Sequence, residues 1–136
     1  MERDNIMLNL QIFGDPVAQG RPRAFRRGNH IGMYDPIKSK SWKETVKWQA
    51  IEQKARNMEG ALILELIFLL KRPKSLPRKV LYHVKKPDLD NLIKAIKDAL
   101  KGICYKDDSQ IVRIYAEKIY ARGGGGTGVI ISLKNI

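Results

Sequence analysis

The stretch PDLDNLIKAIKDALKGICYKDDSQIV, residues 87–112, decides the fold because its apolar pattern changes period along the way. Apolar residues first recur every three or four positions, which predicts a helix over residues 89–100. Gly and polar residues at 102–108 predict a turn. From 111 to 121 polar and apolar side chains alternate, as in a half-exposed strand. The stretch therefore predicts a helix followed by a strand, with aspartates near both ends of the helix.

The flanking sequence extends this pattern to an α+β fold, a single mixed β-sheet with two main helices packed on it. The other expected elements are a strand at 6–13, a hairpin at 21–34 turning at Gly28-Asn29, a helix at 38–57 capped by Ser39 or Ser41, a strand at 61–70, a short strand at 81–84 and a last strand at 129–133. The sequence contains no internal repeat and no linker, so residues 1–136 are expected to form one domain.

Composition narrows the class of protein. The longest apolar run, residues 61–70, is interrupted by Glu65 and is too short to cross a bilayer, and the first ten residues do not resemble a signal peptide. Cys104 is the only cysteine, so an intramolecular disulfide is excluded, and its apolar surroundings favour a core position over a nucleophile. We expect a cytoplasmic protein with no membrane partner.

The charge is unevenly distributed. The net charge is +12 and the pI is about 10.0. Residues 20–57 carry ten Lys and Arg against three acids, and residues 71–87 carry seven Lys and Arg and no acid. Residues 88–110 reverse the sign, with five Asp against four Lys. Two basic segments favour a nucleic-acid partner, whereas the acidic segment repels phosphate and requires a separate explanation.

Asp88 and Asp90 are the first part of that explanation. They follow Pro87, which favours an extended lead-in, and stand where the helix is expected to begin. One interpretation is structural, with Asp90 as the N-cap and Asp88 favoured by the helix dipole. The other is a metal site, because carboxylate oxygens are the ligands that Mg²⁺ and Mn²⁺ prefer. If the strand from residue 111 runs alongside the lead-in and carries Asp108 to it, three carboxylates converge.

Lys94 lies one helical turn after Asp90, with Asp98 one turn further. An i,i+4 ion pair between Lys94 and Asp98 is the structural interpretation, and contact of Lys94 with the scissile phosphate is the functional one. Other site types lack support: the spacing excludes an EF-hand at Asp88, two His and one Cys do not make a zinc site, and the glycine run at 123–126 lacks the end of a P-loop.

Residues 87–112 closely resemble the signature of the RusA family of Holliday-junction resolvases, and the GRPR of residues 20–23 is similar to its phage and prophage branch. The resemblance implies a Mg²⁺-dependent, homodimeric endonuclease that nicks two strands of a four-way DNA junction. By position it implies metal-binding roles for Asp88, Asp90 and Asp108, a catalytic role for Lys94, and a basic position at Lys118. Asp107 and Gln110 match further positions of the motif.

The sequence therefore predicts a metal-dependent, structure-selective endodeoxyribonuclease that resolves four-way junctions in DNA recombination and repair. Its cofactor is expected to be Mg²⁺, with Mn²⁺ as a substitute and no small-molecule cofactor. The residues expected to hold the DNA backbone are basic: Arg21, Arg23, Arg26, Arg27, Lys85, Lys86 and Lys118, together with the basic loop at 71–86. Two alternatives stay open, a non-catalytic DNA- or RNA-binding module whose acids only cap helices, and a basic protein that binds another protein.

Overall fold

The computed structural model of the chain describes residues 6–20, 23–34, 36–123 and 125–136, without the side chains at 23, 25 and 31–34. Its centre is a four-stranded sheet in the order β1-β6-β4-β5, in which β4 and β5 run parallel and the other neighbours antiparallel. These strands are β1 (Met7–Phe13), β4 (Leu62–Leu70), β5 (Ile111–Tyr120) and β6 (Gly128–Asn135). Two helices, α1 (Ile37–Glu52) and α2 (Leu89–Leu100), pack on the sheet, and β2 (Arg23–Arg27) pairs with β3 (His30–Tyr34).

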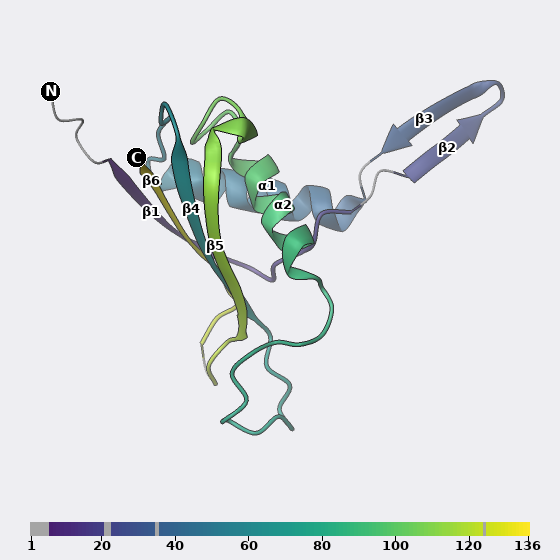
Figure 1. The fold of residues 1–136 in the computed structure, drawn as a ribbon. Helices are drawn as coiled ribbons and strands as arrows, with labels where there is room; N and C mark the ends of the chain where they lie inside the picture. The colour runs from purple at the N-terminus through teal and green to yellow at the C-terminus, as the bar shows by residue number, and fades with distance from the viewer. Residues whose placement is uncertain (1–5, 21–22, 35, 124) are drawn as a thin grey trace, which may run out of the picture.

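The core lies between the sheet and the two helices, which cover the same face of it (Figure 1). Alternate residues of β4 point into this layer, and α2 meets them with its apolar stripe. The almost fully buried side chains at this contact are Leu62, Leu64, Leu66, Phe68, Leu92, Ile96 and Leu100. The prediction of a mixed sheet carrying two helices is therefore confirmed.

The predicted hairpin is also confirmed, but it is not part of the main sheet. β2 and β3 form their own two-stranded sheet and project away from the rest of the molecule (Figure 1). The chain reverses at Gly28, whose φ of 58° is a backbone conformation that favours glycine. The hairpin is thus an arm rather than a layer of the core.

The start of α1 differs from the prediction. Pro36 occupies the N-cap position without a side-chain capping bond, and the helix ends at Glu52 rather than at 57. Ser39 lies inside the first turn, almost fully buried, and its Oγ accepts a hydrogen bond of 3.3 Å from the amide of Gly20. The serine that suggested a helix cap therefore binds the preceding segment instead, so the prediction of Ser39 or Ser41 as the N-cap was wrong.

Side chains of α1 close the outer edge of β1. The amide group of Gln49 bonds to the backbone N–H and C=O of Phe13 at 2.9 and 2.7 Å. Gln53 does the same for Gln11 at 3.0 and 2.8 Å. An unpaired strand edge is a template for pairing with another chain, and these glutamines occupy it.

The opposite edge, formed by β5, is only partly covered. Its last residues pair with the segment before α2 through the bridge between Tyr82 and Ile119, so the expected strand at 81–84 is reduced to this bridge. In the described part of the chain no strand pairs with the earlier residues of this edge. Three large apolar side chains of β5, Val112, Ile114 and Tyr115, are exposed.

No helix in the described ranges is both long enough and apolar enough to cross a membrane. Cys104 is fully buried, as the sequence predicted.

Candidate active site

The segment that leads into α2 is hydrogen-bonded to the C-terminal end of β5. The amide of His83 donates a hydrogen bond of 3.3 Å to the carbonyl oxygen of Lys118. The ammonium of Lys118 in turn donates to the carbonyl oxygens of Lys85 and Pro87 at 2.5 and 2.7 Å. Hydrogen bonds from a charged donor are stronger than neutral ones. The backbone directly before Asp88 is therefore held beside the end of β5.

Asp88 and Asp90 lie at the start of α2 with accessible carboxylates. Asp88 occupies the N-cap position in an extended conformation but makes no side-chain capping bond, and Asp90 lies in the first turn. Both carboxylate oxygens of Asp88 accept hydrogen bonds of 2.8 Å from the ammonium of Lys86, and this contact lowers the pKa of Asp88. Asp90 is not the N-cap, so that part of the structural interpretation was wrong. Neither carboxylate is engaged in capping.

Lys94 lies one turn after Asp90 on the same face of α2, and both side chains are exposed. The alternative partner of Lys94, Asp98, instead forms an ion pair of 3.7 Å with Lys43 of α1. Within the described residues Lys94 takes part in no ion pair. Its ammonium is therefore free to contact an anion bound beside Asp90.

The basic hairpin begins beside the start of α2. The amide of Gln19 donates a hydrogen bond of 2.9 Å to the carbonyl oxygen of Asn91, which adjoins Asp90. Gly20 is fixed by Ser39, and the chain then continues into the arginine-rich hairpin. The base of the hairpin and the acids at the start of α2 are thus neighbours, although 70 residues separate them in the sequence.

Asp107 has a structural role in the turn before β5. It caps a short 3₁₀ helix, η1 (Asp108–Gln110), by accepting a hydrogen bond of 3.2 Å from the amide of Ser109. This bond lowers the pKa of Asp107. Gln110 completes the capping box and donates to the carbonyl oxygens of Met58 and Gly60 at 2.9 and 3.2 Å. Two of the motif positions therefore build the turn.

Asp108 differs from its neighbour. Its Oδ1 is buried and, within the described residues, has no hydrogen-bond partner. Burial raises the pKa of the nearby Tyr105, and the negative charge of Asp108 raises it further. A buried carboxylate oxygen without a partner is costly, and such an atom is typical of a site whose ligand or partner is missing.

The structure does not bring Asp108 to Asp88 and Asp90 within one chain. Asp108 lies beyond the C-terminal end of α2, a helix about 18 Å long at 1.5 Å per residue. Along β5, the seven steps from Ile111 to Lys118 span about 23 Å. The strand does run alongside the lead-in, as expected, but it meets the lead-in with its last residues. Within the described residues the condition for convergence, that β5 carries Asp108 to the lead-in, is therefore not met, and the metal-binding roles of Asp88, Asp90 and Asp108 stay a prediction.

In keeping with this separation, no group of three or more His, Cys, Asp or Glu side chains in the described part of the chain is placed to hold a metal ion. The start of α2 supplies two carboxylates on one surface. One chain therefore brings together two of the three carboxylates predicted to bind a metal, Asp88 and Asp90. The third, Asp108, lies apart from them, beyond the C-terminal end of α2.

The basic residues expected to contact DNA fall into two groups. Arg26 and Arg27 are exposed on the hairpin, where the Nε of Arg26 donates to the carbonyl oxygen of Gly28 at 3.0 Å. Arg21 and the side chain of Arg23 lie outside the described residues. Lys85 is exposed, but Lys86 is bound to Asp88 and Lys118 to backbone carbonyls. In this structure Lys86 and Lys118 organise the acids.

Arg72 is a residue that the sequence did not single out. Its guanidinium donates to the carbonyl oxygens of Ala121, Pro77 and Val80 at 3.2, 3.0 and 2.7 Å, and it lies 5.4 Å from the centre of the Tyr120 ring. It therefore fastens the basic loop 71–80 to the end of β5. Within a run of seven cations nothing local distinguishes this arginine from its neighbours.

Comparison with known proteins agrees with the motif. The family model described as "Endodeoxyribonuclease RusA" matches residues 14–132, which is most of the chain. The chain is also 34% identical over 125 residues to the "Uncharacterized protein YqaN" of Bacillus subtilis (strain 168), an alignment that covers 84% of this chain and 88% of that protein. The matched range contains both aspartate groups, the hairpin, β4, β5 and all of β6 except its last three residues, whereas β1 lies before it. This chain belongs to the RusA family of endodeoxyribonucleases.

Proposed function

We propose that the protein is a metal-dependent endodeoxyribonuclease that nicks four-way DNA junctions. The observation that carries the proposal is the pair of accessible carboxylates at the start of α2, which make no capping bonds and lie beside Lys94 and the base of the basic hairpin. Membership of the RusA family and the net charge of +12 support DNA as the substrate.

The acidic and the basic side chains have different roles at this site. Lys86 binds the carboxylate of Asp88 and lowers its pKa, and Asp88 and Asp90 offer oxygen ligands to Mg²⁺ or Mn²⁺. Such an ion supplies charge stabilisation for phosphodiester hydrolysis when it is bound. Lys94 binds the phosphate that is cut, and the exposed arginines of the hairpin hold the neighbouring backbone.

Two copies of the chain are required to unite the three carboxylates. A twofold axis that pairs the exposed edges of two β5 strands in antiparallel orientation brings the start of one strand to the end of the other. Asp108 of one copy then approaches Asp88 and Asp90 of its partner, on the side of the sheet that carries the helices. The exposed Val112, Ile114 and Tyr115, together with the unpartnered Oδ1 of Asp108, support this arrangement. A homodimer also has two equivalent sites, as paired nicking requires.

The test is a nicking assay on a synthetic four-way junction with Mg²⁺, comparing wild type with Asp90→Asn. The variant is expected to nick at least about 100-fold more slowly, because it loses a charged ligand, and to bind the junction with nearly unchanged affinity. Asp98→Asn removes a carboxylate from the same helix and should retain activity. Undiminished nicking by Asp90→Asn would overturn the site. Junction binding without nicking by the wild type in any divalent metal would identify a non-catalytic module.

A further inference from the structure

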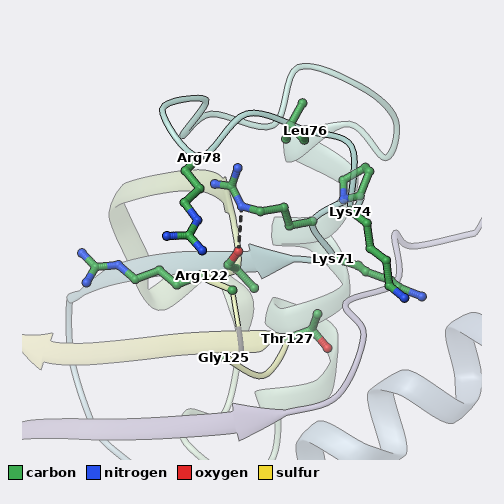
Figure 2. A pocket seen from close by; sticks show the side chains of 11 residues that line it. Lys71, Lys74, Leu76, Arg78, Arg122, Gly125 and Thr127 are labelled. Atoms are coloured by element: carbon green, nitrogen blue, oxygen red, sulfur yellow. Dashed lines mark hydrogen bonds between the residues drawn. The ribbon is translucent and has the colours of Figure 1, made fainter.

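A basic cavity lies at the same end of the main sheet as the candidate acids. It has a volume of about 740 Å³ and is bounded by the loop that follows β4 and by the segment that follows β5. Five cationic side chains line it, Lys71, Arg72, Lys74, Arg78 and Arg122, and no acidic side chain does. Figure 2 shows Arg78 and Arg122 extending to one side and Lys71 and Lys74 to the other.

Four of these cations, all except Arg72, have no competing partners. Within the described residues none of their side chains takes part in a hydrogen bond or an ion pair, and all four are exposed. Asp15, which does not line the cavity, accepts a hydrogen bond of 2.6 Å from the hydroxyl of the lining residue Thr127. The cavity therefore has a concentration of unneutralised positive charge that attracts an anion.

Hydrogen bonds hold the loop that carries Lys71, Lys74 and Arg78 in place before any ligand binds. Arg72 is bound to three backbone carbonyl oxygens, one of them that of Ala121, and its guanidinium lies 5.4 Å from the centre of the Tyr120 ring. These contacts fix the loop against the segment that carries Arg122. At Gly123 a Cβ would meet no atom within 4 Å, so the backbone there is open to close approach by a ligand. A planar guanidinium can donate two hydrogen bonds to the oxygens of one phosphate, so Arg78 and Arg122 suit this ligand.

The cavity lies close to the acids at the start of α2. Lys118 holds the backbone before Asp88, and Arg122 follows it by four residues, which is about 13 Å along an extended chain. At about 3.4 Å of helix rise per phosphate of one strand, this distance corresponds to roughly four nucleotides. A strand that passes the acids therefore has phosphates within reach of the cavity.

We propose that this cavity is a second phosphate-binding site, which holds the backbone of the DNA strand a few nucleotides from the phosphodiester beside Asp90. The inference rests on the proposed function for its substrate. The ligand class is the DNA phosphodiester, and the residues that bind it are Arg78 and Arg122 on one side and Lys71 and Lys74 on the other.

The test measures the salt dependence of junction binding by fluorescence anisotropy, in Asp90→Asn protein so that the DNA stays uncut. Adding Arg78→Gln and Arg122→Gln is expected to weaken binding at least about tenfold and to reduce the slope of log Kd against log salt concentration by about 1.8, for two lost phosphate contacts. The matched control adds Lys54→Gln and Lys134→Gln, the same change of charge at the opposite end of the sheet, and should leave the slope nearly unchanged.

Each other outcome has a definite meaning. Equal effects of the two double variants would overturn the site, because net charge alone would then explain the loss. An unchanged slope in the Arg78/Arg122 variant would overturn it as well. Micromolar binding of ATP or pyrophosphate that the double variant abolishes, with junction binding intact, would identify a free anion as the ligand and overturn the DNA assignment. Failure of the proposed function would be distinguishable, since it would appear as absent nicking by the wild type.

Discussion

The ammonium of Lys118 on β5 lies 2.7 Å from the carbonyl oxygen of Pro87, the residue directly before Asp88. A second hydrogen bond, from the same ammonium to the carbonyl oxygen of Lys85, also holds the segment that leads into α2. Because both acceptors are neutral backbone groups, the lysine retains its charge near the acids while it positions them. Lys118 is therefore a positioning residue in this structure, rather than the freely accessible DNA contact that the sequence suggested.

Replacing Lys118 by Met is expected to lower the free energy of unfolding by about 1–3 kcal/mol, because two charge-assisted hydrogen bonds are lost. The change should also raise the Mg²⁺ concentration needed for half-maximal nicking, since Asp88 loses its fixed backbone. Urea denaturation and a metal titration measure the two effects. Lys79→Met, on the exposed part of the basic loop, is the control and should leave both values unchanged. Equal effects of the two variants would argue against a positioning role.

Local periodicity accounts for what the sequence predicted well. The spacing of Leu92, Ile96 and Leu100 fixes one face of α2, and the apolar run at 61–70 indicates a buried strand, so both elements were predictable without any knowledge of contacts. The acids at the start of α2 were predictable for the same reason, because Pro87 and the apolar stripe together locate the beginning of the helix.

Long-range contacts account for what the sequence predicted poorly. Whether Asp108 reaches Asp88 depends on which end of β5 meets the lead-in, and that is decided by the parallel pairing of β4 with β5. Ser39 has the composition of a helix cap, yet it binds Gly20 from a distant segment. In the sequence Arg72 is one cation among many, and only the structure shows that it binds three carbonyl oxygens. Each of these outcomes requires the packed tertiary structure.

His83 is expected to make stability depend on pH in the neutral to mildly acidic range. Burial lowers its pKa below the ordinary 6.5, and the charges of Lys118 and Lys85 lower it further, while the Tyr120 ring packs at 4.8 Å. The unfolded chain therefore binds this proton more readily, and stability that is present above pH 6.5 is lost as the pH falls through the lower folded pKa.

Thermal unfolding between pH 5 and pH 8 measures this effect. The Tm of the wild type should fall more steeply below pH 6.5 than that of His83→Gln, and the two curves should run parallel above pH 7.5. Asp88 and Asp107, whose pKa values are lowered from 3.8, contribute stability that is lost only at more acidic pH, so they do not interfere. Parallel curves over the whole range would contradict the prediction.

Cys104 is expected to be inert in the folded protein. It is fully buried, and burial raises the pKa of its thiol to about 11. Reaction with an aromatic disulfide reagent at pH 8 should be slower than that of an unfolded sample by about 1000-fold or more, because labelling requires global opening. Lys79→Cys adds an exposed thiol that should react at once. Rapid labelling of Cys104 in the native protein, or loss of nicking in Cys104→Ala without loss of stability, would indicate a chemical role.

Mixing two inactive variants tests whether the acids are shared between copies. Asp90→Asn and Asp108→Asn are each expected to be inactive alone. If Asp108 of one copy joins Asp88 and Asp90 of the other, a dimer of the two variants has one site with both substitutions and one intact site. After random exchange of subunits half of the dimers are mixed, so about one quarter of the wild-type sites should be restored. Each mixed dimer nicks one strand only, so a cruciform plasmid should accumulate as nicked circles rather than as linear DNA.

The matched control is a mixture of Asp88→Asn with Asp90→Asn. These substitutions fall in the same carboxylate pair, so every site in a mixed dimer is defective and no activity should return. Restoration by the first mixture and not by the second would place Asp108 opposite the partner's acids. No restoration in the first mixture, with exchange verified by differently tagged subunits, would mean that the acids act within one chain. In that case α2 or the turn at Asp107 must move by a large distance when DNA binds, because about 20 Å separates the two acidic groups.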